Sequence, residues 1–150
     1  MTTMTSTNTN VSRVYIRATP EQVWKGITDP EFTERYYFGT RVDSTLTPGD
    51  AFVYRGNDGA VALDGEVVEC DPPRRLVQTF RALWGPEVAA EPASRVTWEV
   101  EQDGPGVCRL TVTHDQLDRS PITAQQVAGG WAEILSGLKT VLETGRPLRS

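Results

Sequence analysis

Residues 123–145 read TAQQVAGGWAEILSGLKTVLETG. Apolar side chains recur in this segment at spacings of three and four, which places them along one side of an α-helix. Gly145 and Pro147 are residues that typically end a helix. We therefore predict one long amphipathic helix, which must bury its apolar side against another layer of the fold. Its apolar residues are Val127, Trp131, Ile134, Leu135, Leu138, Val141 and Leu142.

The middle of the chain, residues 51–113, has the pattern of short strands joined by tight turns. Apolar and polar residues alternate most cleanly over residues 95–101, with Val96, Trp98 and Val100 on one face. Strands spaced about ten residues apart, with turns between them, predict an antiparallel meander. One apolar and one polar face indicate that only one side of the sheet is covered. The predicted strands are residues 11–17, 40–44, 51–55, 61–70, 74–82, 95–101 and 108–114.

Two short helices are predicted after the first strand. Thr19 is a preferred N-cap, Pro20 suits the first helical position, and Gln22 completes a capping box. Asp29 and Pro30 then end this helix and begin a second one. The chain therefore contains a strand, two short helices, a run of strands and a long helix.

These elements predict an α+β fold in which a curved antiparallel sheet of six to seven strands wraps on the long C-terminal helix. A curved sheet around a helix leaves a cavity between the two layers, and this cavity is the expected functional site. A chain of 150 residues is most simply one domain. We place this domain at residues 11–146 and expect residues 1–10, mostly Thr, Ser and Asn, to form a disordered tail.

The composition excludes several classes of protein. A formal net charge of −5 argues against nucleic acid and against an anionic membrane surface as the main partner. The N-terminal residues do not resemble a signal peptide, and no apolar run is long enough for membrane insertion. Cys70 and Cys108 form no disulfide framework and have no metal-ligand spacing, which favours small buried residues in a reducing compartment. We therefore expect a cytoplasmic protein.

Two polar residues fall on the apolar faces of the predicted strands. His114, the only histidine, continues the face of Cys108, Leu110 and Val112, where it could bind a ligand or act as a general base. It has no nucleophile or carboxylate partner at a readable spacing, so a hydrogen-bonded structural histidine is the alternative. Gln78 is a buried amide that must be hydrogen-bonded, either to a ligand or to a neighbouring backbone.

The expected cavity lining is mostly apolar. Trp98 and Trp131 fall on the inner faces of the sheet and the helix, where they either build the core or line the cavity. Trp84 lies in a predicted loop, residues 83–92, and could act as a lid. No basic residue falls on the predicted inner faces, so a phosphate would lack a charge partner. The predicted ligand-binding residues are Leu76, Gln78, Phe80, Trp98, Leu110, Val112, His114, Trp131, Leu135 and Leu138.

The sequence contains none of the common motifs for catalysis or nucleotide binding. There is no phosphate-binding loop, no dinucleotide-binding glycine motif, no zinc-protease motif, no nucleophile elbow and no Cys-x-x-Cys pair. The carboxylates of Asp64, Glu66 and Glu69 are spread along one predicted strand and are typical of a solvated face. We therefore predict no catalytic residue, no metal site and no cofactor.

Three segments resemble the START-like (SRPBCC) superfamily. They are ATPEQVWKGITDPEFTERYYFG after the first strand, GEVVECDPPRRLVQTF in the middle, and GGWAEILSGLKTVLETG at the end. The resemblance spans about residues 11–145, and the closer likeness is to the branch named for its similarity to the activator of the ninety-kilodalton heat-shock chaperone ATPase. It implies the helix-grip fold, with the long helix gripped by the sheet. It also implies a cavity for a lipid-like, polyketide-like or aromatic molecule.

The resemblance implies no single activity, because members of the superfamily include lipid carriers, hormone receptors, aromatase/cyclases and chaperone activators. We expect a protein that binds a small hydrophobic molecule, in stress response or regulation, in preference to an enzyme. The first alternative is an enzyme of the polyketide cyclase/aromatase type, in which His114 or Gln78 directs a reactive chain. The second is a modulator of a chaperone ATPase, with the chaperone as its protein partner. The sequence agrees equally with a monomer and a homodimer.

Overall fold

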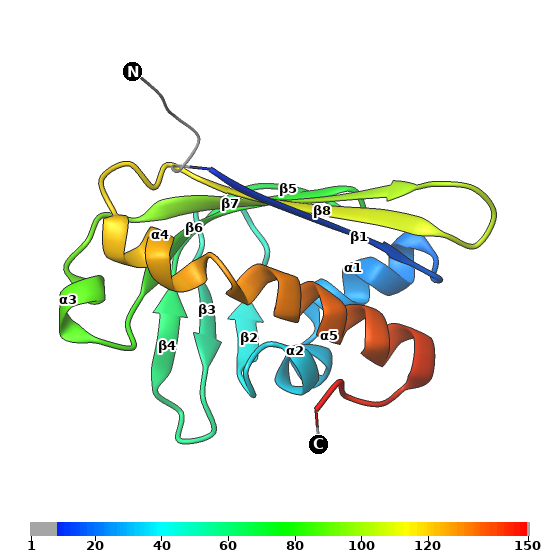
Figure 1. Ribbon diagram of the computed structural model, residues 1–150, viewed down its shortest axis with the longest axis horizontal. Helices are drawn as coiled ribbons and strands as arrows, with labels where there is room; N and C mark the ends of the chain where they lie inside the picture. Colours follow the sequence, from blue (N-terminus) through cyan, green and yellow to red (C-terminus); the bar gives the residue numbers. More distant parts are fainter. Residues whose placement is uncertain (1–8, 150) are drawn as a thin grey trace.

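A curved antiparallel sheet of eight strands forms one layer of the molecule, and helices pack against it (Figure 1). The computed structural model describes residues 9–149. The strand order is β1-β8-β7-β6-β4-β3-β2, and β5 pairs with β6 off this path. The strands are β1 (Asn10–Ile16), β2 (Arg41–Ser44), β3 (Phe52–Arg55), β4 (Val61–Asp64), β5 (Val67–Asp71), β6 (Arg75–Ala82), β7 (Ser94–Gln102) and β8 (Cys108–Asp115).

Two short helices connect β1 to β2. In α1 (Pro20–Thr28), the Gln22 backbone N–H donates to Thr19 Oγ1 over 3.1 Å, and the Thr19 N–H donates to Gln22 Oε1 over 2.9 Å. In α2 (Pro30–Tyr36), the carboxylate of Asp29 accepts a hydrogen bond from the first turn. Such caps satisfy backbone N–H groups that have no partner within the helix. The predicted capping box and both helix starts are confirmed.

The predicted C-terminal helix consists of two helices, which corrects the expectation of one continuous element. Helix α4 (Pro121–Val127) ends shortly before Gly129, and α5 (Gly130–Thr144) begins after it. A Cβ atom at Gly129 or Gly130 would meet no other atom within 4 Å, so close packing does not require these glycines. Each glycine costs about 1 kcal/mol of helix stability relative to alanine, which explains a break at this point. Helix α5 ends at Gly145, whose φ is 78°.

The predicted strand over residues 61–70 is divided at Gly65. Strands β4 and β5 on either side of this glycine pair with successive parts of β6. A Cβ atom at Gly65 would lie 1.9 Å from the backbone oxygen of Thr79 on β6, so no other residue fits here. Gly65 therefore lies between the strand that pairs with the end of β6 and the strand that pairs with its beginning, at a position where no side chain fits.

Two other boundaries also differ from the prediction. The predicted loop over residues 83–92 contains a short helix, α3 (Pro86–Ala89), which begins at a proline in the first helical position. Strand β1 begins at Asn10, and residues 1–8 of the predicted tail lie outside the described residues.

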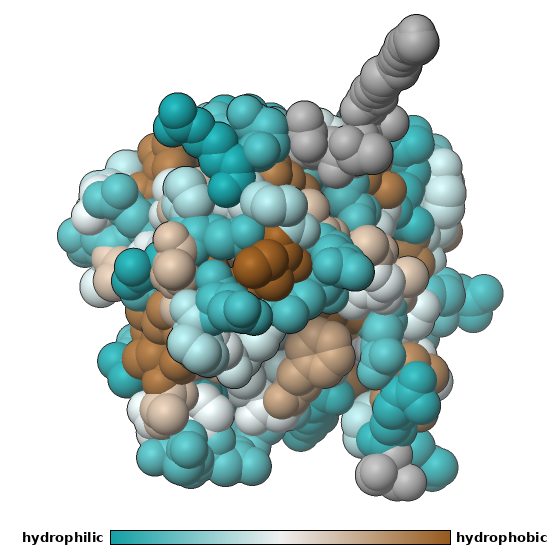
Figure 2. All heavy atoms as spheres, turned by 60° about the vertical axis from the view of Figure 1, so that its left-hand side comes forward, coloured by the Kyte–Doolittle hydropathy of each residue, from teal (hydrophilic) through white to brown (hydrophobic). Residues whose placement is uncertain are grey.

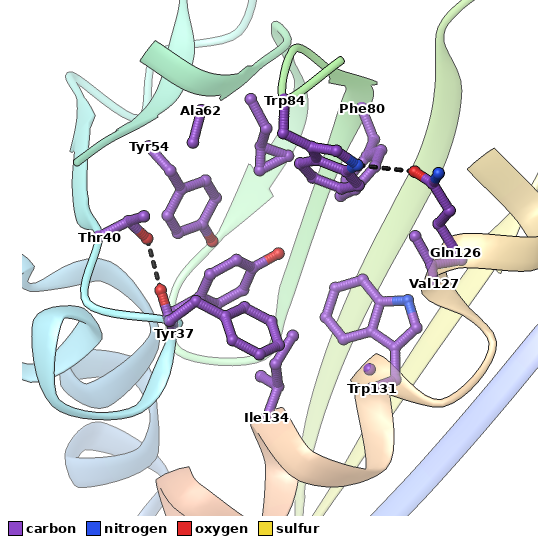
Figure 3. Close-up of a pocket in the computed structure, with 13 residues that line it drawn as sticks. Tyr37, Thr40, Tyr54, Ala62, Phe80, Trp84, Gln126, Val127, Trp131 and Ile134 are labelled. Carbon is purple, nitrogen blue, oxygen red and sulfur yellow. Dashed lines mark hydrogen bonds between the residues drawn. The ribbon is translucent and has the colours of Figure 1, made fainter. Parts of the chain in front are cut away.

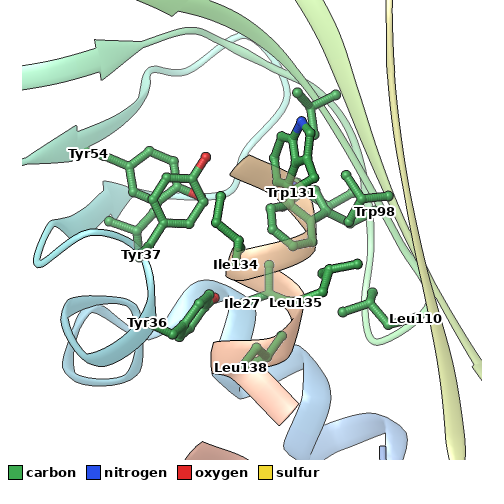
Figure 4. Packing of buried hydrophobic residues seen from close by; sticks show 14 of the residues in the cluster. Ile27, Tyr36, Tyr37, Tyr54, Trp98, Leu110, Trp131, Ile134, Leu135 and Leu138 are labelled. Carbon is green, nitrogen blue, oxygen red and sulfur yellow. The ribbon is translucent and has the colours of Figure 1, made fainter. Parts of the chain in front are cut away.

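The apolar side of α5 packs against the sheet, as its residue spacing predicts. Trp131 is 2% exposed, and its ring meets that of Trp98 on β7 edge to face, with the centroids 5.5 Å apart. Figure 4 shows Trp131 and Leu135 on the helix beside Trp98 and Leu110 on the sheet. A helix held inside a curved antiparallel sheet, after two short helices, confirms the predicted helix-grip fold.

Candidate functional site

A pocket of about 530 Å³ lies where α4 meets α5 (Figure 3). The end of α4 and the first turns of α5 form one wall, β3, β4 and β6 form the opposite wall, and the connection from α2 to β2 closes one end. Pockets that hold small molecules commonly measure about 300–1,000 Å³. The lining residues are Tyr37, Phe38, Thr40, Tyr54, Ala62, Leu63, Phe80, Trp84, Gln126, Val127, Gly130, Trp131 and Ile134.

Aromatic rings form much of the pocket wall. The rings of Tyr37 and Tyr54 are stacked, with centroids 4.1 Å apart and an interplanar angle of 13°. Tyr37 also meets Trp131 edge to face at 6.3 Å, and Phe80 meets Trp84 in the same manner at 6.5 Å. Ring pairs of this kind favour defined relative orientations, so the wall presents a fixed arrangement of ring faces and edges.

Two exposed aromatic residues lie at the mouth of the pocket. Phe38 is 63% exposed and Trp84 is 51% exposed, although both also line the pocket. The indole N–H of Trp84 donates to Gln126 Oε1 over 2.6 Å, which joins the loop after β6 to α4. The backbone of Phe38 has a φ of 53°, in the left-handed region that is uncommon for residues other than glycine. Trp84, which the sequence suggested as a possible lid, thus lines the pocket from an exposed position, and a lid role stays a prediction.

The pocket lining carries no charged side chain. Its polar groups are the hydroxyls of Tyr37, Tyr54 and Thr40, the amide of Gln126 and the indole of Trp84. Thr40 Oγ1 donates to the backbone oxygen of Tyr37 over 2.6 Å. Burial raises the pKa of both Tyr37 and Tyr54 well above the ordinary value, so each phenol keeps its proton and can donate a hydrogen bond.

The structure brings only some of the predicted ligand-binding residues to this pocket. Phe80 and Trp131 line it. The other predicted residues lie in the closed core between α5 and the sheet, and none is more than 2% exposed. The open part of the cavity therefore lies toward β3 and β4, because large side chains fill the space beneath β7 and β8. The residues in the closed core are Leu76, Gln78, Trp98, Leu110, Val112, His114, Leu135 and Leu138.

His114 belongs to a chain of buried hydrogen bonds behind the pocket wall. The indole N–H of Trp131 donates to His114 Nδ1 over 3.1 Å, and His114 Nε2 lies 2.7 Å from Ser94 Oγ. Because Nδ1 accepts, the imidazole proton is on Nε2 and is donated to Ser94. Ser94 Oγ donates in turn to the backbone oxygen of Phe80 over 3.2 Å. This chain joins α5 to three strands and orients the indole that lines the pocket.

The geometry of His114 does not suit a general base. A histidine that activates a serine accepts the serine proton on Nε2, and a carboxylate orients it at Nδ1–H. Here Nε2 donates and Nδ1 accepts, and both His114 and Ser94 are buried away from the pocket lining. Burial lowers the pKa of His114 to about 4, against a smaller opposite effect of Asp115, so the ring is neutral at pH 7. His114 fits the structural alternative.

The remaining candidates from the sequence are also accounted for. Gln78 Oε1 accepts a hydrogen bond of 3.0 Å from the indole of Trp98, so this amide is paired within the core. Cys70 and Cys108 are free thiols whose pKa is raised by burial, which does not favour a thiolate nucleophile.

Within residues 9–149, no group of three His, Cys, Asp or Glu side chains could hold a metal ion. No helix in this range has the length and apolar character needed to span a membrane.

Tyr37 and Tyr54 are pocket residues that the sequence pattern does not assign to the site. The usable signal is the aromatic run Tyr36-Tyr37-Phe38 followed by Gly39, which ends the second short helix and turns large side chains toward the next strand. Tyr54 gives no such signal, because a tyrosine in a strand is ordinary.

Comparison with known proteins identifies one matching family model. The model described as activator of Hsp90 ATPase homolog 1-like protein matches residues 17–143 of this chain. No curated protein matches the chain.

Several solved structures are similar to this one. CalU16 from Micromonospora echinospora is 23% identical with a TM-score of 0.71, over 91% of this chain and 77% of that chain. DynU16, described as belonging to the dynemicin biosynthetic locus, is 25% identical with a TM-score of 0.76, over 95% of this chain and 50% of that chain. The Aha1 dimer from Colwellia psychrerythraea is 19% identical with a TM-score of 0.71, over 91% of this chain and 97% of that chain. These likenesses support the helix-grip fold.

Proposed function

The chain belongs to the family of activator of Hsp90 ATPase homolog 1-like proteins, and from this premise we propose that it binds a small, mostly apolar molecule. The binding site is the pocket between the α4–α5 wall and strands β3, β4 and β6. The observation that carries this proposal is a pocket of about 530 Å³ whose lining combines six aromatic side chains with no charged one. Small-molecule sites commonly have such apolar walls with a few polar groups.

The absence of charge in the lining supports an apolar ligand over a nucleotide or sugar phosphate. A phosphate group would be taken out of water with no Lys, Arg or His side chain in the lining to pair with it. Burying an ionised group without a partner is strongly unfavourable. We therefore expect fatty acids or aromatic molecules to bind through their apolar parts, and nucleotides not to bind in the pocket.

The same lining favours binding over catalysis. Enzymes that move protons use a positioned acid or base with a pKa near the working pH. The lining contains no Asp, Glu, His, Lys or Cys, and its two phenols are held neutral by burial. An enzyme of the cyclase/aromatase type would have to act by shaping its substrate alone.

A chaperone-directed role finds less support on the face of the molecule that Figure 2 shows. The face drawn in Figure 2 is mostly hydrophilic, and its apolar side chains form small separate groups. Surfaces that dock protein partners commonly present a larger continuous apolar patch.

Displacement of a neutral fluorescent dye, Nile red, tests the proposal. Fatty acids and aromatic acids should displace the dye from the wild-type protein, and nucleotides should not. Ala62→Phe places a ring in the pocket and should abolish dye binding. Ala60→Phe is the matched control, because residue 60 is exposed in the turn between β3 and β4. Unchanged dye binding by Ala62→Phe, or displacement by nucleotides alone, would contradict the proposal.

A further inference from the structure

The hydroxyl group of Tyr54 is buried without a hydrogen-bond partner. Tyr54 is 1% exposed and lines the pocket, yet its Oη atom has no partner among the described residues. The hydroxyl of Tyr37 lies close enough to influence the pKa of Tyr54 as a hydrogen-bonding neighbour, but the pair does not meet normal hydrogen-bond geometry. An unpaired polar group inside a protein reduces stability and therefore needs an explanation.

Other buried polar side chains nearby are paired. The hydroxyl of Tyr36, one residue before Tyr37, donates to the backbone oxygen of Gly26 over 2.7 Å. The indoles of Trp98 and Trp131 also have acceptors. The fold thus provides partners for buried donors in this part of the core, and the exception occurs at the pocket.

The surroundings of the unpaired hydroxyl restrict what could bind to it. In Figure 3 the hydroxyl of Tyr37 points toward the middle of the pocket, and the hydroxyl of Tyr54 lies beside the Tyr37 ring. Both phenols are protonated donors, and no charged side chain lines the pocket. A carboxylate or phosphate would be buried here without an opposite charge, so the acceptor that fits is an uncharged oxygen.

We propose that Tyr54 is the polar anchor of the pocket and donates a hydrogen bond to a carbonyl oxygen on a flat aromatic ligand. The ring system of the ligand would lie among the rings of Tyr37, Phe80 and Trp131, which already present faces and edges for stacking. The Tyr54 hydroxyl is covered in the structure, so side chains around it, including the stacked ring of Tyr37, would have to move to admit the oxygen. This inference rests on the proposed function of the pocket.

Fluorescence titration with three probes tests the inference. Acridone has three fused rings and one carbonyl, anthracene has three fused rings without oxygen, and a dansylated undecanoic acid has a flexible chain. We expect acridone to bind roughly five- to tenfold more tightly than anthracene, as one additional hydrogen bond predicts. Tyr54→Phe should remove that difference by weakening acridone binding alone.

Thermal unfolding without ligand separates an anchoring role from a structural one. Tyr54→Phe removes an unpaired hydroxyl, so the melting temperature should be unchanged or higher. Tyr36→Phe is the matched control, because it removes a paired hydroxyl outside the pocket. It should lower the melting temperature and leave the affinity for acridone unchanged.

The outcomes distinguish this inference from the proposed function. Equal affinities for acridone and anthracene, or unchanged acridone binding by Tyr54→Phe, would overturn the anchor while leaving an apolar binding pocket. Tight binding of the dansylated acid without binding of acridone would have the same meaning. Binding of none of the three probes would overturn the proposed function and the anchor together.

Discussion

Two buried polar clusters lie on opposite sides of the Trp131 indole, and they differ in how their hydrogen bonds are satisfied. On the sheet side, His114 and Ser94 form a continuous chain with the indole N–H. On the pocket side, the ring of Trp131 meets Tyr37, whose stacked neighbour Tyr54 has an unpaired hydroxyl. Figure 3 shows the indole nitrogen turned away from the two tyrosines. The paired cluster stabilises the fold, and the unpaired hydroxyl beside the cavity is the basis of the proposed anchor.

The largest expected effect comes from removing the side chain that the two clusters share. Trp131→Ala should lower the free energy of unfolding by roughly 3–5 kcal/mol, because it leaves a cavity and unpairs His114. Trp84→Ala, at the exposed mouth, should cost about 1 kcal/mol or less. Urea unfolding of both variants measures the difference. Equal losses would show that the sheet-side cluster is no more important to stability than the mouth.

The free energy of unfolding, measured as a function of pH, tests the paired cluster through the protonation of His114. The folded protein holds the pKa of His114 at about 4, against an ordinary value of 6.5, because burial disfavours the charged ring. The unfolded chain therefore binds the proton first as the pH falls, and stability decreases between pH 6.5 and 4. This group accounts for about 3 kcal/mol of that decrease. Above pH 6.5 it has no effect.

The variant His114→Leu is the control for this titration, because carboxylates elsewhere also titrate as the pH falls. The variant should be less stable than the wild type at pH 7, since it leaves the Trp131 N–H and Ser94 without their partner. Its stability should depend less on pH between 6.5 and 4. The same pH dependence in both proteins would contradict a neutral, buried His114.

A pair of conservative substitutions compares a paired amide elsewhere in the core with the unpaired hydroxyl of Tyr54. Gln78→Leu leaves the Trp98 indole N–H unpaired and should cost about 1–3 kcal/mol of unfolding free energy. Tyr54→Phe removes a group that has no partner and should cost about 0 kcal/mol. Chemical denaturation measures both values. A large loss for Tyr54→Phe would mean that its hydroxyl serves the fold, and the distinction between the clusters would disappear.

The fold could be predicted largely from local patterns. The spacing of Trp131, Leu135 and Leu138 determined which side of the last helix is buried, and the alternation in residues 95–101 determined a strand. These signals are periodic and arise within a few residues of one another. The division at Gly65 was not predicted, because it depends on the backbone of β6. The break at Gly129 was not predicted either, because the low helix propensity of glycine does not by itself determine whether a long helix continues or is interrupted.

The pocket was harder to predict because its position depends on which side chains fill the rest of the cavity. The sequence identified an inner face, and Phe80 and Trp131 do line the pocket. Residues of the same inner face, such as Leu110 and Val112, are packed under α5 with no open space beside them. Periodicity distinguishes inside from outside, but it cannot distinguish core from cavity. That distinction arises from contacts between residues far apart in the chain.

The indole N–H signals of the four tryptophans provide the most direct test of the central claim. In a nitrogen–proton NMR spectrum recorded with and without acridone, the signals of Trp84 and Trp131 should move most, because both residues line the pocket. Trp98 should move less, since it contacts Trp131 from behind, and Trp24 on α1 should not move. Movement of Trp24 with no change at Trp84 and Trp131 would contradict binding in this pocket.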